Sequence, residues 1–166
     1  MLEAGHVESQ DRREVLTYAE ERVLPHVDFA EAARLAAGKV WTRASGSQQA
    51  QLVAAYRPIF IRSYFEALRA HGGQTLKVLP AQAASRGAND ITVQSRLEGH
   101  GEAPLTVEYA LRRAGGEWKI YDIRIDGESL VASCRLVFEQ VARSEGIAGL
   151  IKRMKGNARS RPVVTA

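Results

Sequence analysis

The sequence lacks the residues that mark several chemical and structural classes. It contains one cysteine among 166 residues, which excludes a disulfide framework, a cysteine zinc site and a Cys-x-x-Cys redox pair. No run approaches the roughly twenty consecutive apolar residues of a membrane-spanning helix. The opening residues MLEAGHVESQ lack the apolar core of a signal peptide. A globular domain of ordinary composition, 45% hydrophobic and 25% charged, remains as the interpretation.

Catalytic motifs are also scarce. The chain has no glycine-rich phosphate loop, and its histidines show no metal-ligand spacing, so no metal ligand is expected. The best acid–base candidates are Asp122 and Asp126, which lie four residues apart on one predicted strand. Their parity is opposite to that of the apolar residues Tyr121, Ile123 and Ile125, so we expect both carboxylates to face water. An isomerase-like enzyme built on these two residues stays open as an alternative.

The first third of the chain predicts helices. A helix over 11–24 should stop at Pro25, because proline has no N–H to donate. Asp28 followed by Glu31 has the spacing of a capping box and predicts the start of a second helix.

A third and longest helix is predicted over about 47–71. Ser45 and Gln48 repeat the capping-box spacing at its start, and Pro58 inside it predicts a kink. The apolar side chains at helical spacing define one broad buried face: Leu52, Tyr56, Ile59, Phe60, Ser63, Tyr64 and Leu68.

Alternating patterns after residue 73 predict four strands joined by short links, the arrangement of an antiparallel meander. The strands are 74–80, 91–97, 105–112 and 118–125. Gly127 then turns the chain into a helix that Ser129 begins or caps. One stripe of that helix should be buried, namely Leu130, Cys134, Val137, Phe138 and Val141. Gly146 separates a last amphipathic helix. Helices segregated from a meander indicate an α+β fold, a curved antiparallel four-stranded sheet with N- and C-terminal helices packed on one face.

The distribution of charge along the sequence helps to predict the bounds of the domain. The net charge is +4, and basic residues gather without acidic partners near the end, from Lys152 to Arg161. We expect residues 1–9 to be disordered or vector-derived, residues 10–156 to form one domain, and residues 157–166 to be a basic flexible tail. Such a tail either attracts an anionic surface or only solubilises the chain.

Several segments together resemble the MlaC, or toluene-tolerance, family of periplasmic phospholipid-binding proteins. They are VLPHVDF, GKVW, QLVAAYRPIFIRSYFEAL, GGQTLKVLP, YALRRAGGEWKIYDIRIDGESLV and EGIAGLIKRMK, in order from Val15 to Lys155. The hopanoid-associated relatives look similar, which leaves carriage of a hopanoid-like or other hydrophobic molecule as an alternative. Two departures from the family pattern are Pro58 and Glu128.

The resemblance implies a cone-shaped fold of the NTF2-like kind and a non-enzymatic, soluble periplasmic carrier whose signal peptide has been removed. It implies that the cargo is a bound phospholipid, held by its acyl chains, and that no cofactor is needed. The transport would serve the maintenance of outer-membrane lipid asymmetry. It also implies two docking partners, an inner-membrane ABC lipid transporter complex and an outer-membrane lipoprotein–porin complex.

Apolar residues of the predicted strands and helices are the candidate lipid lining, although each of them is equally suited to an ordinary core. They are Phe60, Tyr64, Val93, Val107, Tyr109, Tyr121, Ile123, Val131, Cys134 and Phe138. A nucleic-acid-binding module is the third hypothesis. It is disfavoured because the aromatic residues fall on predicted buried faces and not between exposed basic residues.

Overall fold

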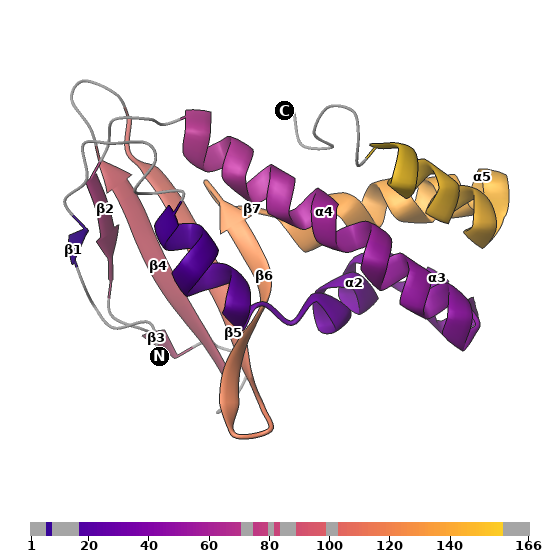
Figure 1. Cartoon of the computed structure of the whole chain (residues 1–166), viewed down its shortest axis with the longest axis horizontal. Coiled ribbons are helices and arrows are strands. Elements are labelled where there is room, and N and C mark those ends of the chain that lie inside the picture. The colour runs from indigo at the N-terminus through magenta and orange to yellow at the C-terminus, as the bar shows by residue number, and fades with distance from the viewer. Residues whose placement is uncertain are drawn as a thin grey trace. The chain divides into compact units, whose positions relative to one another are not determined.

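A computed structural model describes residues 6–7, 17–70, 75–79, 82–83, 89–98 and 103–157 (Figure 1). Most of the basic tail, from residue 158, and most of the segment 1–9 lie outside these ranges. The chain divides into two compact units, which are treated separately below. The sheet unit comprises Met1–Asp28 and Tyr64–Glu128, and the helical unit comprises Phe29–Ser63 and Ser129–Ala166.

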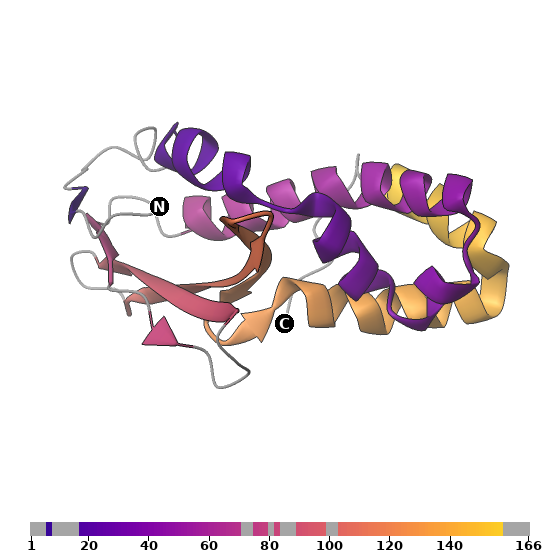
Figure 2. The ribbon, with the colours of Figure 1, turned by 90° about the horizontal axis from the view of Figure 1, so that it is seen from below.

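An antiparallel sheet forms the sheet unit, and the four predicted strands are confirmed as its main members. The described strands are β1 (His6–Val7), β2 (Thr75–Val78), β3 (Gln82–Ala83), β4 (Asp90–Glu98), β5 (Leu105–Ala114), β6 (Glu117–Ile125) and β7 (Glu128–Ser129). Their order is β1-β2-β4-β5-β6-β7, with β3 pairing β4 beside β2. The open, curved sheet is visible in Figure 2. His6 and Val7 pair with Lys77 and Leu76, so these two residues form part of the sheet within the segment expected to be disordered.

One face of the sheet is apolar and the other is polar, as the alternation predicts. Val93, Leu97, Val107 and Leu111 are buried on the apolar face. Side chains on the polar face pair across strands. The pairs are Asp90 with Arg112, Gln94 with Glu108, Glu108 with Arg124, and Lys77 with Glu98. Only one face therefore supplies apolar surface for a core or a ligand.

A register shift in β6 overturns two predictions, the face of Tyr121 and the exposure of Asp122. Leu111 pairs with Ile120, but the preceding residue of β5, Ala110, pairs with Asp122, so Tyr121 is an extra residue in β6. This β-bulge reverses the parity of the strand, because two residues of β6 oppose one of β5. Asp122 is buried, with 6% of its surface exposed, and the expectation that it faces water is wrong. Tyr121 is half-buried and does not share the buried face of Ile123.

The segment before the helical unit ends in a tight helix. A π-helix over Ala19–Val23 leads into a 3-10 helix over Leu24–His26, which contains Pro25. The chain is then extended, and Val27 forms a parallel bridge with Ile120 of β6. The predicted helix end near Pro25 is confirmed. The π-helix ends at Val23, and the 3-10 helix that contains Pro25 ends at His26.

The helical unit contains α2 (Phe29–Ala37), α3 (Lys39–Arg43), most of α4 (Gly46–Ala70) and α5 (Leu130–Asn157). The capping box at α4 is confirmed, because Ser45 N–H donates to Gln48 Oε1 (3.0 Å) and Gln48 N–H donates to Ser45 Oγ (3.2 Å). The predicted apolar face of α4 is buried throughout. Pro58 lies inside the helix, which continues on both sides of it. Among the helices in the described ranges, none has the length and apolar character needed to cross a membrane.

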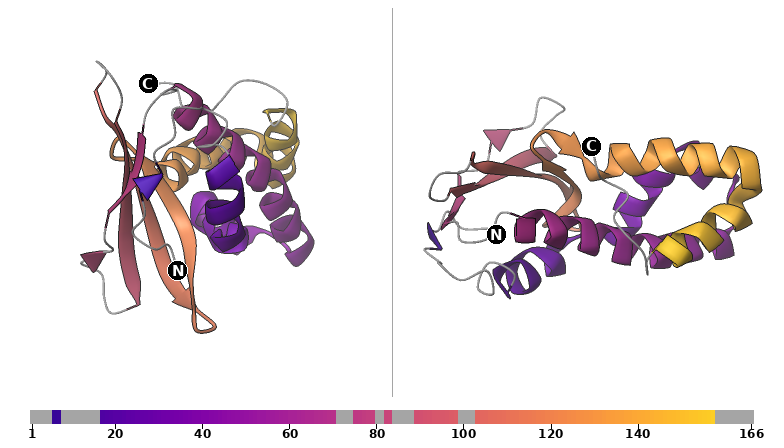
Figure 3. Two further views of the ribbon diagram at one scale, coloured as in Figure 1. Left: turned by 60° about the vertical axis from the view of Figure 1, so that its left-hand side comes forward. Right: turned by 90° about the horizontal axis from the view of Figure 1, so that it is seen from above.

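Helix α5 begins and bends where the sequence indicates. Ser129 Oγ accepts a hydrogen bond from Ala132 N–H (2.9 Å), the expected N-cap. Gly146 has φ +72° and ψ 178°, a conformation that breaks the helix and favours glycine. The segment after it returns alongside α4, as Figure 3 shows, and Lys155 Nζ donates to Gln51 Oε1 (3.3 Å). The predicted stripe is wrong at Val137, which is 38% exposed because the buried face follows Leu130, Cys134 and Phe138.

Candidate lipid-binding residues

The apolar face of the sheet brings together five candidate lining residues. Val93 pairs with Tyr109, and Tyr109 pairs with Ile123 on its other side, so the three side chains form a row across the sheet. Val107 lies two residues before Tyr109 on the same face. Tyr64 from α4 packs edge-to-face on Tyr109, with ring centroids 6.2 Å apart. All five are buried, which makes them a continuous apolar surface within the sheet unit.

Three hydroxyl groups form a buried chain within this surface. Tyr64 Oη lies 2.8 Å from Tyr109 Oη, which lies 3.2 Å from Ser95 Oγ. Burial raises the pKa of the Tyr64 phenol well above its usual value, and burial also raises the pKa of Tyr109. These contacts give the three buried hydroxyl groups hydrogen-bond partners. Without partners, the hydroxyl groups would cost free energy in an apolar setting. These hydroxyl contacts were not predicted from the sequence, although Ser95 at an apolar parity position was a usable signal.

The other four buried candidates lie in the helical unit. Val131, Cys134 and Phe138 recur at three and four residues on one face of α5, and Phe60 lies on α4. Tyr56 connects the two helices, since its ring lies 6.0 Å from that of Phe60 and 6.2 Å from that of Phe138. Tyr56 lies on the predicted buried face of α4 but is not among the predicted lining residues.

Tyr121 lies in a different environment from the other candidates. The Arg112 guanidinium lies 4.8 Å above its ring, and Arg112 Nε donates to Asp90 Oδ1 on the polar face. A cation above an aromatic ring stabilises the pair modestly at an exposed site. The structure thus groups Tyr121 with polar side chains.

The two carboxylates that suggested an enzyme occupy unlike positions. Asp122 is buried on the bulged strand, whereas Asp126 is exposed in the following turn with φ +49°. Asp126 Oδ1 accepts from Thr106 N–H (3.1 Å), and Asp126 N–H donates to Thr106 O (2.9 Å). Asp126 thus closes the turn at the end of β6. Among the described residues, no three His, Cys, Asp or Glu side chains group as metal ligands would.

Gly127 and Glu128 follow Asp126 where the chain turns from β6 into β7. Gly127 has φ +86°, so the expected turn is confirmed and depends on glycine. Glu128, the departure from the family pattern, is exposed in β7.

Comparison with known proteins gives concordant results. The family model described as "MlaC protein" matches residues 1–156. The intermembrane phospholipid transport system binding protein MlaC of Haemophilus influenzae is 23% identical over 158 residues, which cover 93% of this chain and 73% of that protein.

A solved structure agrees with both. The phospholipid-binding protein from Ralstonia solanacearum, determined in complex with a phospholipid, superposes with a TM-score of 0.71 and 27% identity. The match covers 90% of this chain and 83% of that one. These relatives are named for binding and transport, and none is named as an enzyme. Since the family model spans nearly the whole sequence, and the α+β architecture agrees, the chain belongs to the MlaC family.

Proposed function

We propose that this chain binds phospholipid and carries it between the inner and outer membranes across the periplasm. The observation that carries the proposal is the family match over residues 1–156, together with the similar protein solved with phospholipid bound. The apolar side chains on the sheet and on α4 and α5 are suited to acyl chains. The cargo is the only ligand required, so we expect no cofactor and no chemical step.

Physical chemistry constrains how such a carrier operates. Two acyl chains of about sixteen carbons gain roughly 25 kcal/mol on leaving water, at about 0.8 kcal/mol per methylene. This exceeds the strongest non-covalent affinities, about 18–21 kcal/mol, so ordering and pocket opening offset part of it. Escape of lipid into water is therefore very slow, while exchange with another apolar site has a net drive near zero. A carrier of this kind exchanges its cargo where a partner holds a second apolar site close by.

The partners proposed from the membership of the MlaC family are membrane complexes on both sides of the periplasm. We assign the inner-membrane partner to an ABC lipid transporter complex and the outer-membrane partner to a lipoprotein–porin complex. Maintenance of outer-membrane lipid asymmetry is the process that this exchange would serve.

A vesicle transfer assay tests the proposal. Donor vesicles carry a self-quenched fluorescent phospholipid, acceptor vesicles carry none, and the rate of dequenching is measured against protein concentration. A rate that rises in proportion to protein supports the carrier. A rate no greater than spontaneous exchange, for protein that also takes up no lipid, contradicts it.

A pair of substitutions on α5 serves as a matched comparison. Phe138 is buried and Leu136 is 74% exposed, although both are large apolar residues on the same helix. We expect Phe138→Ala to reduce lipid uptake from vesicles and Leu136→Ala to leave it unchanged. Circular dichroism establishes that each variant is folded before uptake is compared.

A further inference from the structure

Charge is distributed unequally between the two compact units. The helical unit contains twelve lysines and arginines against three acidic residues, a net charge of +9. The sheet unit contains eleven basic and sixteen acidic residues, a net charge of −5. The modest net charge of +4 therefore conceals a strongly cationic unit. A surface field of one sign raises the encounter rate with partners of the opposite sign.

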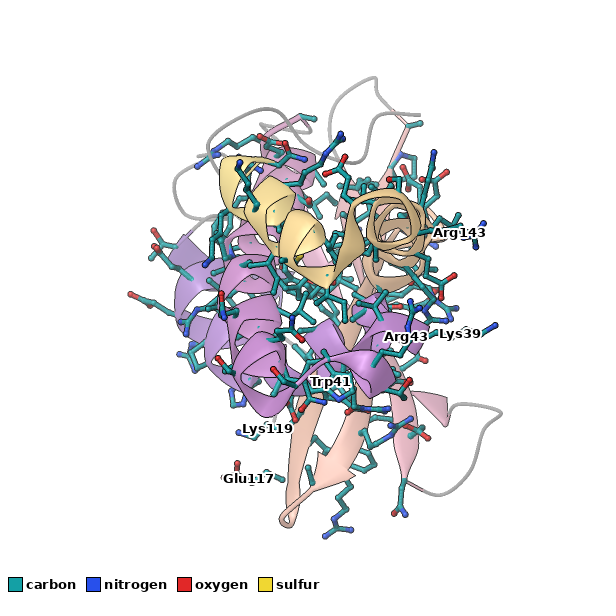
Figure 4. The ribbon with its side chains drawn as sticks, turned by 90° about the vertical axis from the view of Figure 1, so that its right-hand side faces the viewer. Lys39, Trp41, Arg43, Glu117, Lys119 and Arg143 are labelled. Atoms are coloured by element: carbon teal, nitrogen blue, oxygen red, sulfur yellow. The ribbon has the colours of Figure 1, made fainter. Side chains whose placement is uncertain are left out.

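An open hollow on the helical unit concentrates part of this charge. The hollow has a volume of about 450 Å³ and is lined by Lys39, Thr42 and Arg43 of α3 and by Glu139 and Arg143 of α5. Figure 4 shows Lys39, Arg43 and Arg143 on one side of the unit. All three cations are exposed, and none takes part in an ion pair between described residues. One carboxylate against three free cations leaves the hollow with a net positive charge.

The local backbone allows α3 and α5 to lie close together beside this hollow. Gly38 joins α2 to α3 with φ +54°, and a Cβ atom there would lie 2.9 Å from Glu139 Oε1. Arg135, one turn earlier on α5, donates from Nε to Leu35 O (2.8 Å) and holds α5 against the end of α2. The glycine thus permits α3 and α5 to approach with Glu139 between them.

An exposed apolar residue adjoins the charged hollow. Leu136 is 74% exposed and lies three residues before Glu139 and seven before Arg143, so all three share one side of α5. A leucine at such exposure contributes nothing to the core of the unit. Next to cations, it offers an apolar anchor point of the kind that interfaces bury.

We infer that the hollow between α3 and α5 is the docking site for an acidic protein segment that carries an apolar residue. A flat bilayer surface cannot enter a concave site, whereas side chains of a peptide can. Glu139 and Thr42 add an acceptor and a hydroxyl, which suit the mixed polar groups of a peptide better than a uniform layer of phosphates. Within the proposed function, which this inference deepens, the segment belongs to a protein that exchanges lipid with the carrier.

Selection from a random peptide library displayed on phage tests the inference. The full chain is the bait, and a variant with Lys39→Glu and Arg43→Glu is the counter-selection. We expect the selected peptides to be rich in Asp and Glu around an apolar residue. Their affinity for the variant should fall by roughly tenfold or more, as expected for charge reversal in an interface.

A variant with Lys152→Glu and Lys155→Glu is the matched control, because it makes the same change in net charge on the exposed face of the last part of α5. Equal weakening by both variants would attribute binding to overall charge and overturn the inference, as would selected peptides without acidic enrichment. Vesicles containing phosphatidylglycerol form a parallel arm. Loss of vesicle binding in the hollow variant, without loss of peptide binding, would assign the site to a membrane instead. Lipid content by native mass spectrometry separates these outcomes from failure of the proposed function, since it should be unchanged in both variants.

Discussion

Replacing Gly38 by alanine perturbs the junction of α2, α3 and α5 at a single atom. Alanine at φ +54° and ψ −126° occupies a backbone region that costs about 1–3 kcal/mol. Its Cβ would also lie 3.2 Å from Arg135 Cδ, and Arg135 is held by its hydrogen bond to Leu35 O. Weakening that bond adds about 0.5–1.5 kcal/mol. Moving the Glu139 carboxylate aside costs little free energy, because it is the end of a flexible side chain. We therefore expect the free energy of unfolding to fall by about 2–4 kcal/mol.

Urea unfolding followed by tryptophan fluorescence measures this change. The chain has two tryptophans, and a Trp118→Phe background leaves Trp41 of α3, three residues from the substitution, as the reporter. Gly46→Ala is the matched control, because a Cβ there meets no atom within 4 Å and its φ is not positive. We expect the control to stabilise by about 0.4–1 kcal/mol through loss of unfolded-chain freedom. If the two variants unfold at the same urea concentration, the strain assigned to Gly38 is refuted.

Three further changes test the polar contacts. Tyr109→Phe removes both hydrogen bonds among the buried hydroxyl groups and should lower the free energy of unfolding in urea by about 1–3 kcal/mol. This is roughly twice the loss expected for Tyr64→Phe, and equal losses would contradict the hydrogen-bonding arrangement. Because burial raises the pKa of both phenols, their neutral forms are favoured in the folded state. Stability should therefore be full below about pH 10 and fall as the pH rises above it, and the Tyr64→Phe variant should lose less stability there. Ser45→Ala removes one half of the capping box and should cost about 1 kcal/mol, whereas Ser47→Ala, at an exposed position in the first turn of α4, should be neutral in thermal unfolding.

Local signals predicted the features that depend on neighbouring residues. Ser45 with Gln48 and Ser129 form the caps that their spacing indicates, because a cap involves only one turn of helix. Gly127 and Gly146 adopt the positive φ values that the turns at those positions require. The alternation of β4 and β5 predicted the correct buried face, since one face of an antiparallel sheet is apolar over its whole length.

Features that depend on a partner far along the chain were not predictable. The extra residue Tyr121 reverses the parity of β6, and no glycine or turn signal marks it, so Tyr121 was placed on the wrong face and Asp122 was wrongly expected to face water. Val137 fits a helical stripe in sequence but lies outside the face that α5 buries. The cationic hollow depends on residues about a hundred positions apart in α3 and α5, and its shape follows from Gly38, whose role appears only when both helices are in place.

Native mass spectrometry of the protein purified from bacteria tests the central claim most directly. If the chain carries phospholipid, the spectrum contains a population heavier than the bare chain by the mass of one phospholipid, which organic extraction removes and incubation with vesicles restores. A single lipid-free mass, unchanged after incubation with phospholipid vesicles, would contradict it.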